Sequence, residues 1–252
     1  MTIKIAYQLY SSRLFPPLEE QLPDIKAMGF DAVEPWLPAY EADPQNFRRM
    51  LDRNGLACYG FHMPLRGLVQ EPARFIEIAQ TLGATWMITP YLAPEERGTT
   101  PEFWRGLGET LRAGAERVGA HGLKIAWHNH DFEFRPLPDG SLPIAHILEG
   151  GGPNVAFEAD LAWVVRAGGD PRTVLSRFGD KIRLLQIKDT APPGTTQDGG
   201  WTATGDGIID WQGLVPLLRD GRIDHFVVEH DNPSDWRDVA RRSIAFFRSL
   251  PL

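Results

Sequence analysis

Eight short runs of apolar residues recur along the chain, and each is followed by a stretch with helical periodicity. The runs lie about one β-strand and one α-helix apart. They cover residues 3–9, 30–34, 57–62, 85–89, 123–128, 154–160, 182–188 and 225–229. No linker, low-complexity tract or block of like charge interrupts them. The pattern predicts an α/β fold, a single (β/α)8 barrel in which residues 1–252 form one domain.

The best-defined helix is predicted from Pro101 to about Ala120. Thr100 supplies a capping hydroxyl, and Pro101 suits the first helical position. Apolar residues recur at three-to-four spacing and should form the buried face, namely Phe103, Leu107, Leu111, Ala115 and Val118. Several glycines interrupt this stretch, so packing rather than intrinsic propensity must stabilise the helix.

Polar groups that bind metals or transfer protons lie at the ends of four successive runs. They are His128 and His130 after the fifth run, Glu158 and Asp160 in the sixth, Gln186 and Lys188 in the seventh, and Glu229 in the eighth. Side chains alternate along a strand, so each pair shares one face, and neighbouring strands lie about 5 Å apart. These groups can therefore meet at one barrel mouth. The oxygen-rich set predicts one divalent metal, with Mn²⁺ favoured and Mg²⁺, Co²⁺ or Zn²⁺ as alternatives.

Two loops on the same side are longer than a simple connection needs. They cover residues 131–141 and 189–207, and the second is rich in glycine and proline. Barrels place active sites on the C-terminal side of their strands. We expect a lid or binding loop here, with a disordered surface excursion as the alternative.

Composition excludes several classes of protein. The net charge is −7, and no run of Lys and Arg exceeds two residues, which argues against nucleic-acid binding. The single cysteine, Cys58, excludes a disulfide framework and a cysteine-type zinc site. The first apolar run leaves no room for a signal peptide, and no run approaches the length of a membrane span. We expect a soluble, cytoplasmic protein with no membrane partner.

Six motifs spread over nearly the whole chain resemble one family. They are Gly60-Phe-His62, His128-Asn-His-Asp-Phe-Glu-Phe134, Phe157-Glu-Ala-Asp-Leu-Ala-Trp163, Gln186-Ile-Lys-Asp189, Gly205-Asp-Gly-Ile-Ile-Asp-Trp211 and Val228-Glu-His-Asp231. The chain resembles the xylose-isomerase-like barrel superfamily of sugar isomerases and epimerases, which also includes inosose dehydratases and endonuclease IV. The motif around His128 looks closer to the branch that acts on inososes and 3-keto-glycosides.

The resemblance implies a four-residue metal site. Family members typically use Glu, Asp, His and Glu from the ends of strands five to eight. Asp160 matches the aspartate and Glu229 the final glutamate, whereas His128 stands in place of the first glutamate and Gln186 in place of the histidine. Gln186 is a poorer ligand than histidine for a transition metal, so we expect weaker binding.

The resemblance also implies proton transfer next to a sugar carbonyl. In such chemistry a metal stabilises an enediolate while a side chain removes a proton from carbon. The candidate proton-transfer residues are Glu158, His130 and Glu133, and Glu133 is also a candidate replacement ligand. Lys188 is a candidate to bind a substrate oxygen or a phosphate, or to act as an acid.

Three further residues are candidate substrate contacts. His62 ends the third run and Glu34 the second, both on the side where barrels place active sites. Trp163 stands where many epimerases have a substrate-contacting histidine, so the resemblance implies an apolar or sugar-stacking wall there. Structural roles remain the alternative for each of them.

The expected function is that of a metal-dependent sugar or cyclitol isomerase or epimerase, or a dehydratase or lyase, acting on a small-molecule substrate. One alternative is a non-catalytic sugar-binding barrel whose metal site has decayed. A less favoured one is an abasic-site endonuclease, which needs more ligands and a basic surface. Barrels of this kind often pair through their C-terminal faces, which leaves a homodimer open.

Overall fold

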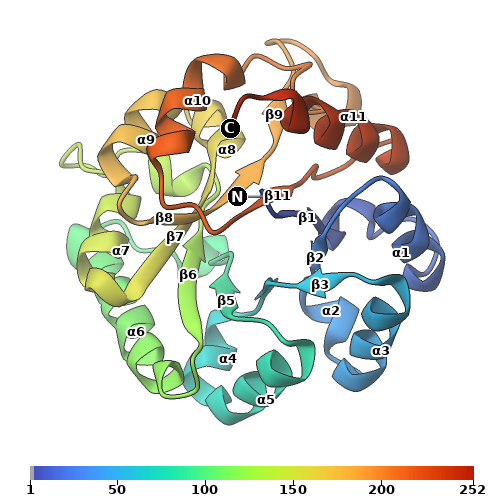
Figure 1. Ribbon diagram of the computed structural model, residues 1–252. Helices are drawn as coiled ribbons and strands as arrows, with labels where there is room; N and C mark the ends of the chain where they lie inside the picture. Colours follow the sequence, from blue (N-terminus) through green and yellow to red (C-terminus); the bar gives the residue numbers. More distant parts are fainter. Residues whose placement is uncertain (1–2) are drawn as a thin grey trace.

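The computed structural model describes residues 3–252, and every predicted apolar run forms a strand in it. The strands of the main sheet are β1 (Ile5–Gln8), β2 (Ala32–Glu34), β3 (Ala57–Cys58), β4 (Gly60–His62), β5 (Trp86–Thr89), β6 (Lys124–His128), β7 (Val155–Asp160), β8 (Ile182–Ile187) and β11 (His225–Val228). Figure 1 shows them at the centre of the molecule, with the helices around them.

The sheet closes into a barrel through the third predicted run. The strand order is β3-β2-β1-β11-β8-β7-β6-β5-β4, and all the pairs are parallel. Its two end strands, β3 and β4, are separated only by Tyr59. The backbone N–H of His62 donates to the carbonyl of Pro35, just past β2, at 2.9 Å. The nine strands therefore form a nearly closed TIM barrel, which confirms the predicted α/β class.

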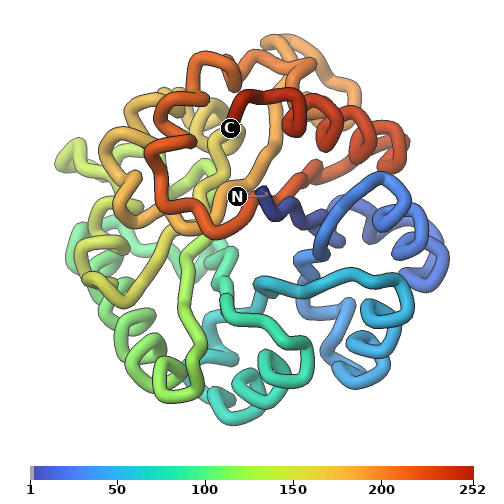
Figure 2. Tube along the Cα trace, viewed as in Figure 1, coloured from blue at the N-terminus to red at the C-terminus, as the bar shows by residue number. Residues whose placement is uncertain are grey.

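Helices cover the outside of the sheet, and Figure 2 shows the chain passing around the barrel from blue to red. They are α1 (Leu18–Ala27), α2 (Leu37–Tyr40), α3 (Pro44–Asn54), α4 (Leu65–Gln70), α5 (Pro72–Leu82), α6 (Pro101–Gly119), α7 (Pro143–Gly151), α8 (Leu161–Arg166), α9 (Pro171–Phe178), α10 (Trp211–Asp220) and α11 (Trp236–Ser249). Within residues 3–252, no helix has the length and apolar character needed to cross a membrane.

Helix α6 has nearly the predicted bounds, but the prediction that Phe103 belongs to its buried face is wrong. Phe103 is 38% exposed, whereas the neighbouring Trp104 is buried. The buried face is rotated toward Trp104 and Gly108, where α6 approaches α7 closely. A Cβ atom on Gly108 would lie 2.2 Å from the carbonyl oxygen of Ile147, so only glycine fits this contact.

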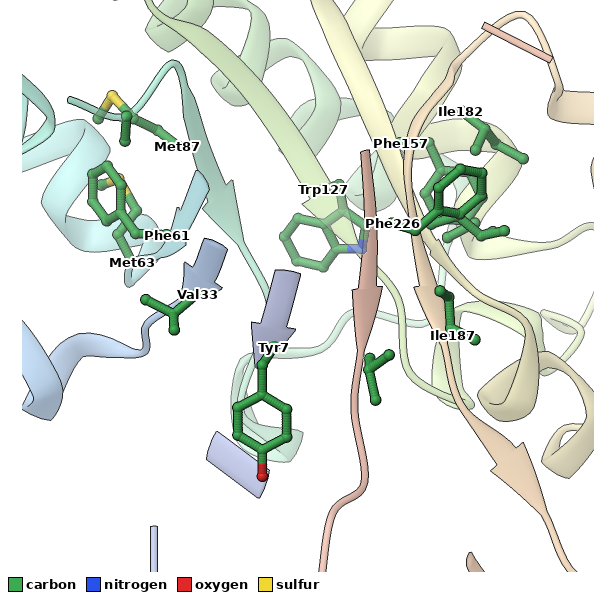
Figure 3. Close-up of a cluster of buried hydrophobic side chains, with 14 of the residues drawn as sticks. Tyr7, Val33, Phe61, Met63, Met87, Trp127, Phe157, Ile182, Ile187 and Phe226 are labelled. Carbon is green, nitrogen blue, oxygen red and sulfur yellow. The ribbon is translucent and has the colours of Figure 1, made fainter. Parts of the chain in front are cut away.

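Two apolar layers support the barrel mouth. Large side chains on the outer faces of the strands pack against the helices, among them Tyr7, Phe61, Trp127 and Phe157 (Figure 3). On the opposite strand faces, smaller clusters fill the barrel interior with Ala6, Ala32, Val227, Trp86, Ile88, Ala126, Ala156 and Leu184. Because side chains alternate, the residue two positions further along each of these strands is again on the inner face, at the C-terminal end.

Candidate active site

A cavity of about 740 Å³ opens at the C-terminal ends of the strands. Its lining comprises Tyr10, Trp36, Leu37, His62, Met63, Pro64, Pro90, Tyr91, His128, His130, Trp163, Trp201, Glu229 and Asp231. We call it the central cavity. A cavity of about 770 Å³ lies beside α7 and the end of α9, but none of the predicted site residues lines it. The central cavity is therefore the open space onto which predicted site residues at the strand ends face.

The predicted metal ligands come together beneath this cavity. One ligand atom from each of His128, Asp160 and Glu229 lies within 4.8 Å of the other two, and all three side chains are buried. Gln186 pairs with Asp160 in the register of β7 and β8. Its amide oxygen faces Oδ2 of Asp160 and Oε2 of Glu229, and a half-turn of the amide would direct its NH₂ at both oxygens instead.

Lys188 lies against the same carboxylates. Its Nζ is 3.0 Å from Oε2 of Glu229, 3.4 Å from Oδ2 of Asp160 and 2.6 Å from Oδ2 of Asp231. Burial alone would lower the pKa of Lys188, but Asp231, Glu229 and Asp160 raise it above its ordinary value, which keeps the ammonium charged. No role was predicted for Asp231, although it closes the motif that begins at Val228.

A divalent ion fits this set of donors. Burial lowers the pKa of His128 well below its ordinary value, so the neutral ring offers a lone pair. Oδ1 of Asp160 accepts the N–H groups of Ala162 and Trp163 at the start of α8, which orients the carboxylate and leaves Oδ2 directed at the cluster. Burial raises the pKa of Asp160 and brings that of Glu229 to about 7, whereas the Lys188 ammonium acts to lower both. A 2+ ion bound between these carboxylates would favour their ionised form.

A second buried group lies next to the first. Nε2 of His62 is 3.0 Å from Oε1 of Glu34 and 3.1 Å from Oε2 of Glu158. Burial would lower the pKa of His62, but its bonds to Glu158 and Glu34 raise it to about 10. Burial and the Glu34 charge raise the pKa of Glu158 well above its ordinary value. Oε2 of Glu158 also lies 3.6 Å from Nδ1 of His128, so this carboxylate joins the two groups.

Glu133 is held outside the central cavity. Its two oxygens accept from Nε1 of Trp127 and from the backbone N–H of His130, each at 2.9 Å. Burial raises the pKa of Glu133 to about 8. His130 itself lines the cavity, and burial lowers its pKa to about 3. The contacts of Glu133 thus fix the backbone that presents His130.

The loop of residues 189–207 is folded over the site. Two short antiparallel strands, β9 (Asp189–Thr190) and β10 (Trp201–Thr202), form within it. The buried Asp189 carboxylate accepts from the N–H groups of Thr190, Gly205 and Ile209 and from Nε1 of Trp211. The hairpin places Trp201 in the cavity wall, 4.7 Å from the Trp163 ring. The predicted binding loop thus adds one wall of the cavity.

Comparisons with known proteins agree with this architecture. Residues 22–250 match the family model described as xylose isomerase-like TIM barrel. An inosose dehydratase from Lacticaseibacillus casei is 20% identical, and the match covers 92% of this chain and 90% of that protein. A sugar phosphate isomerase/epimerase from Parabacteroides distasonis has a similar structure, with a TM-score of 0.85, 19% identity and coverage of 100% and 97%.

A second solved structure of similar fold holds a metal. The IolI protein, whose structure contains a zinc atom, gives a TM-score of 0.77 at 18% identity, covering 97% of this chain and 96% of that chain. At such identities the structural likeness shows the fold, whereas the family match extends along most of the sequence. The chain therefore belongs to the xylose isomerase-like TIM barrel family.

Proposed function

We propose that the protein is a divalent-metal-dependent isomerase or epimerase, or a dehydratase or lyase, that moves a proton next to the carbonyl of a sugar or cyclitol. The observation that carries this proposal is the placement of two buried groups, one of ligand type and one of proton-transfer type, against the same cavity. The similarity to inosose dehydratase and to a sugar phosphate isomerase/epimerase supports the reaction class.

His128, Asp160, Gln186 and Glu229 would hold the metal, and Mn²⁺ is the favoured ion. The zinc atom in the structure of the IolI protein supports a divalent metal for this chain. When bound, such an ion supplies Lewis-acid stabilisation of negative charge on a carbonyl or hydroxyl oxygen. Lys188, fixed among three carboxylates, adds positive charge next to the same cavity.

Proton transfer would use the histidines of the cavity wall. Glu158 is fully buried, so it reaches a substrate only through a side chain that lines the cavity. His62 and His128 both do so, at 3.1 and 3.6 Å from its Oε2. Because His128 would bind the metal, we assign His62 as the ring through which Glu158 exchanges a proton with the substrate, and His130 as the second proton-transfer group. Glu34 holds His62 in place and Trp163 supplies an apolar wall for the substrate.

Hydrogen exchange with solvent tests the proposal. The protein is loaded with Mn²⁺ in D₂O, and deuterium uptake beside the carbonyl of ketoses and inososes is followed by NMR. We expect uptake with the wild type and none with Asp160→Asn. Asp170→Asn is the matched control, because Asp170 caps α9 through Arg172 and Thr173 as Asp160 caps α8, but it lies on the surface. Equal exchange by wild type and Asp160→Asn would contradict the proposal.

One observation favours the alternative of a non-catalytic sugar-binding barrel. The Lys188 ammonium already pairs with two of the carboxylates that would bind the metal. In that case sugars would bind to the central cavity, but no substrate would exchange hydrogen and no metal would be retained.

A further inference from the structure

We infer that the substrate is an uncharged carbohydrate of more than one ring rather than a sugar phosphate. The inference deepens the proposed function and rests on it, since it concerns the ligand of the same cavity. It is carried by three features: the charge of the lining, the helix N-termini after the last two barrel strands, and the arrangement of aromatic rings.

The charged lining of the central cavity is acidic. Glu229 and Asp231 line it, while no lysine or arginine side chain of residues 3–252 does. The buried Lys188 is already surrounded by three carboxylates. The His62 ring also lines the cavity but is paired with Glu34 and Glu158, and the carboxylates of the metal cluster would offset the charge of a bound 2+ ion. A phosphate carries about 1.5 to 2 negative charges at neutral pH, so it would enter this lining without an unpaired side-chain cation to meet it.

The arginines that stack on aromatic rings of the lining are already paired. Arg97 lies 5.1 Å from the centroid of the Tyr91 ring and donates to the carbonyl of Leu92. Arg13 lies 3.7 Å from the centroid of the Tyr10 ring, and its Nη1 donates to the carbonyls of Tyr10 and Asp231. Arg166 lies 3.2 Å from the Trp201 centroid and donates to the carbonyl of Gly199. These guanidinium groups stack on aromatic rings and donate to backbone carbonyls. They therefore do not form a phosphate site.

The helix N-termini at which TIM barrels usually bind phosphate are also capped by side chains of the chain itself. TIM barrels frequently bind phosphate at the loops after their last two strands, where a helix N-terminus offers free N–H groups. Here the helices that follow those strands are α10 and α11. Asp210 accepts the N–H of Gly213 in α10, and Asp235 accepts those of Arg237 and Asp238 in α11. The carboxylates of the chain thus place negative charge at both N-termini and occupy three of their N–H donors.

Aromatic rings stand on opposite sides of the mouth. Tyr10 and Trp36 follow β1 and β2, and their rings are 6.2 Å apart. Trp163 follows β7, on the opposite side of the ring of strands, and packs on Trp201 and on His130. Aromatic faces are suited to the apolar faces of sugar rings. Two such surfaces across a cavity of about 740 Å³, in the upper part of the roughly 300–1,000 Å³ range of small-molecule sites, suit a second ring beside the reacting one.

Tryptophan fluorescence provides the test, because three tryptophans line the cavity. The Mn²⁺-loaded protein is titrated with fructose, with fructose 6-phosphate, and with lactulose, an uncharged ketose that carries a second ring. We expect lactulose to bind about tenfold tighter than fructose, and fructose 6-phosphate at least about tenfold weaker than fructose. Trp36→Ala should reduce the preference for lactulose over fructose to about twofold or less.

Any one of three results would overturn the inference. Fructose 6-phosphate could bind as tightly as fructose, lactulose could bind no tighter than fructose, or none of the three sugars could change the fluorescence. Deuterium uptake by the same ketoses separates this outcome from failure of the proposed function. Faster uptake by fructose 6-phosphate would leave proton transfer standing and overturn only the substrate class. The expected binding order without uptake by any carbonyl sugar would support the uncharged ligand and contradict the reaction.

Discussion

The ammonium of Lys188 lies 3.0 Å from Oε2 of Glu229, the oxygen that also faces the amide of Gln186. Oδ2 of Asp160 faces the same two side chains. The lysine therefore neutralises part of the charge of the proposed metal site, which makes the burial of these carboxylates less costly.

Replacing Lys188 with Met should destabilise the metal-free protein strongly. Removing one partner leaves buried carboxylates without a counter-charge, which typically costs about 3–5 kcal/mol of unfolding free energy. Urea unfolding measures the loss, and Mn²⁺ should recover part of it. Lys124→Met is the control, because Lys124 is exposed and pairs only loosely with Asp224 at 3.9 Å. A Lys188→Met protein as stable as the wild type would show that the carboxylates around Lys188 are not all ionised at the same time in the folded protein.

Replacing Gln186 with His should tighten the binding of transition metals. Imidazole is a better ligand than an amide for Zn²⁺ or Mn²⁺, whereas Mg²⁺ prefers oxygen, so we expect a gain of about tenfold for Zn²⁺ and little for Mg²⁺. Calorimetry on the metal-free variant and wild type provides the comparison. Unchanged or weaker Zn²⁺ affinity would remove Gln186 from the ligand set and favour the orientation in which its NH₂ bridges the two carboxylates.

Replacing Asp189 with Asn should loosen the wall that holds Trp201. The carboxylate accepts from four donors, and an amide would turn its NH₂ toward some of them, at a cost of about 1–3 kcal/mol. Urea unfolding gives the stability change, and the fluorescence spectrum reports the exposure of tryptophan. Asp198→Asn, in the same loop but half-buried and with one side-chain bond, from Oγ of Ser234, should change both much less. Equal effects of the two substitutions would mean that Asp189 does not organise the loop.

Acid should destabilise the protein partly through His225. This residue is buried at the start of β11, packs on Tyr59 and leaves Nε2 without a partner among residues 3–252. Burial lowers the pKa of His225 in the folded protein. Below about pH 6.5 the unfolded chain therefore binds a proton at His225 more readily than the folded protein does. Stability should fall as the pH drops from 7 to 5, and less so in His225→Phe. Urea unfolding at both pH values checks this, and identical pH dependence would contradict it.

Local sequence patterns predicted the barrel and the inner face of its strands well. Period-two alternation placed Glu158 and Asp160 together, and strand spacing placed Asp160 near Glu229, because both depend only on regular backbone geometry. The contact between Lys188 and Asp231 joins two separate strand ends, and the bonds that withdraw Glu133 depend on the path of a loop. Such features arise from three-dimensional packing, which no local pattern records. The orientation of Phe103 was missed for the same reason, since it is set by the close contact of α6 with α7.

The central claim is that His128, Asp160, Gln186 and Glu229 form one divalent metal site. Calorimetric titration of the metal-free protein with Mn²⁺ tests it most directly, with Asp160→Asn and the cap control Asp170→Asn in parallel. Both variants keep a side-chain oxygen that can cap a helix, so their folds should survive. The proposal predicts one equivalent of Mn²⁺ bound by wild type and Asp170→Asn, and none by Asp160→Asn. Binding that is unchanged in Asp160→Asn, or absent from the wild type at millimolar Mn²⁺, would contradict the metal site.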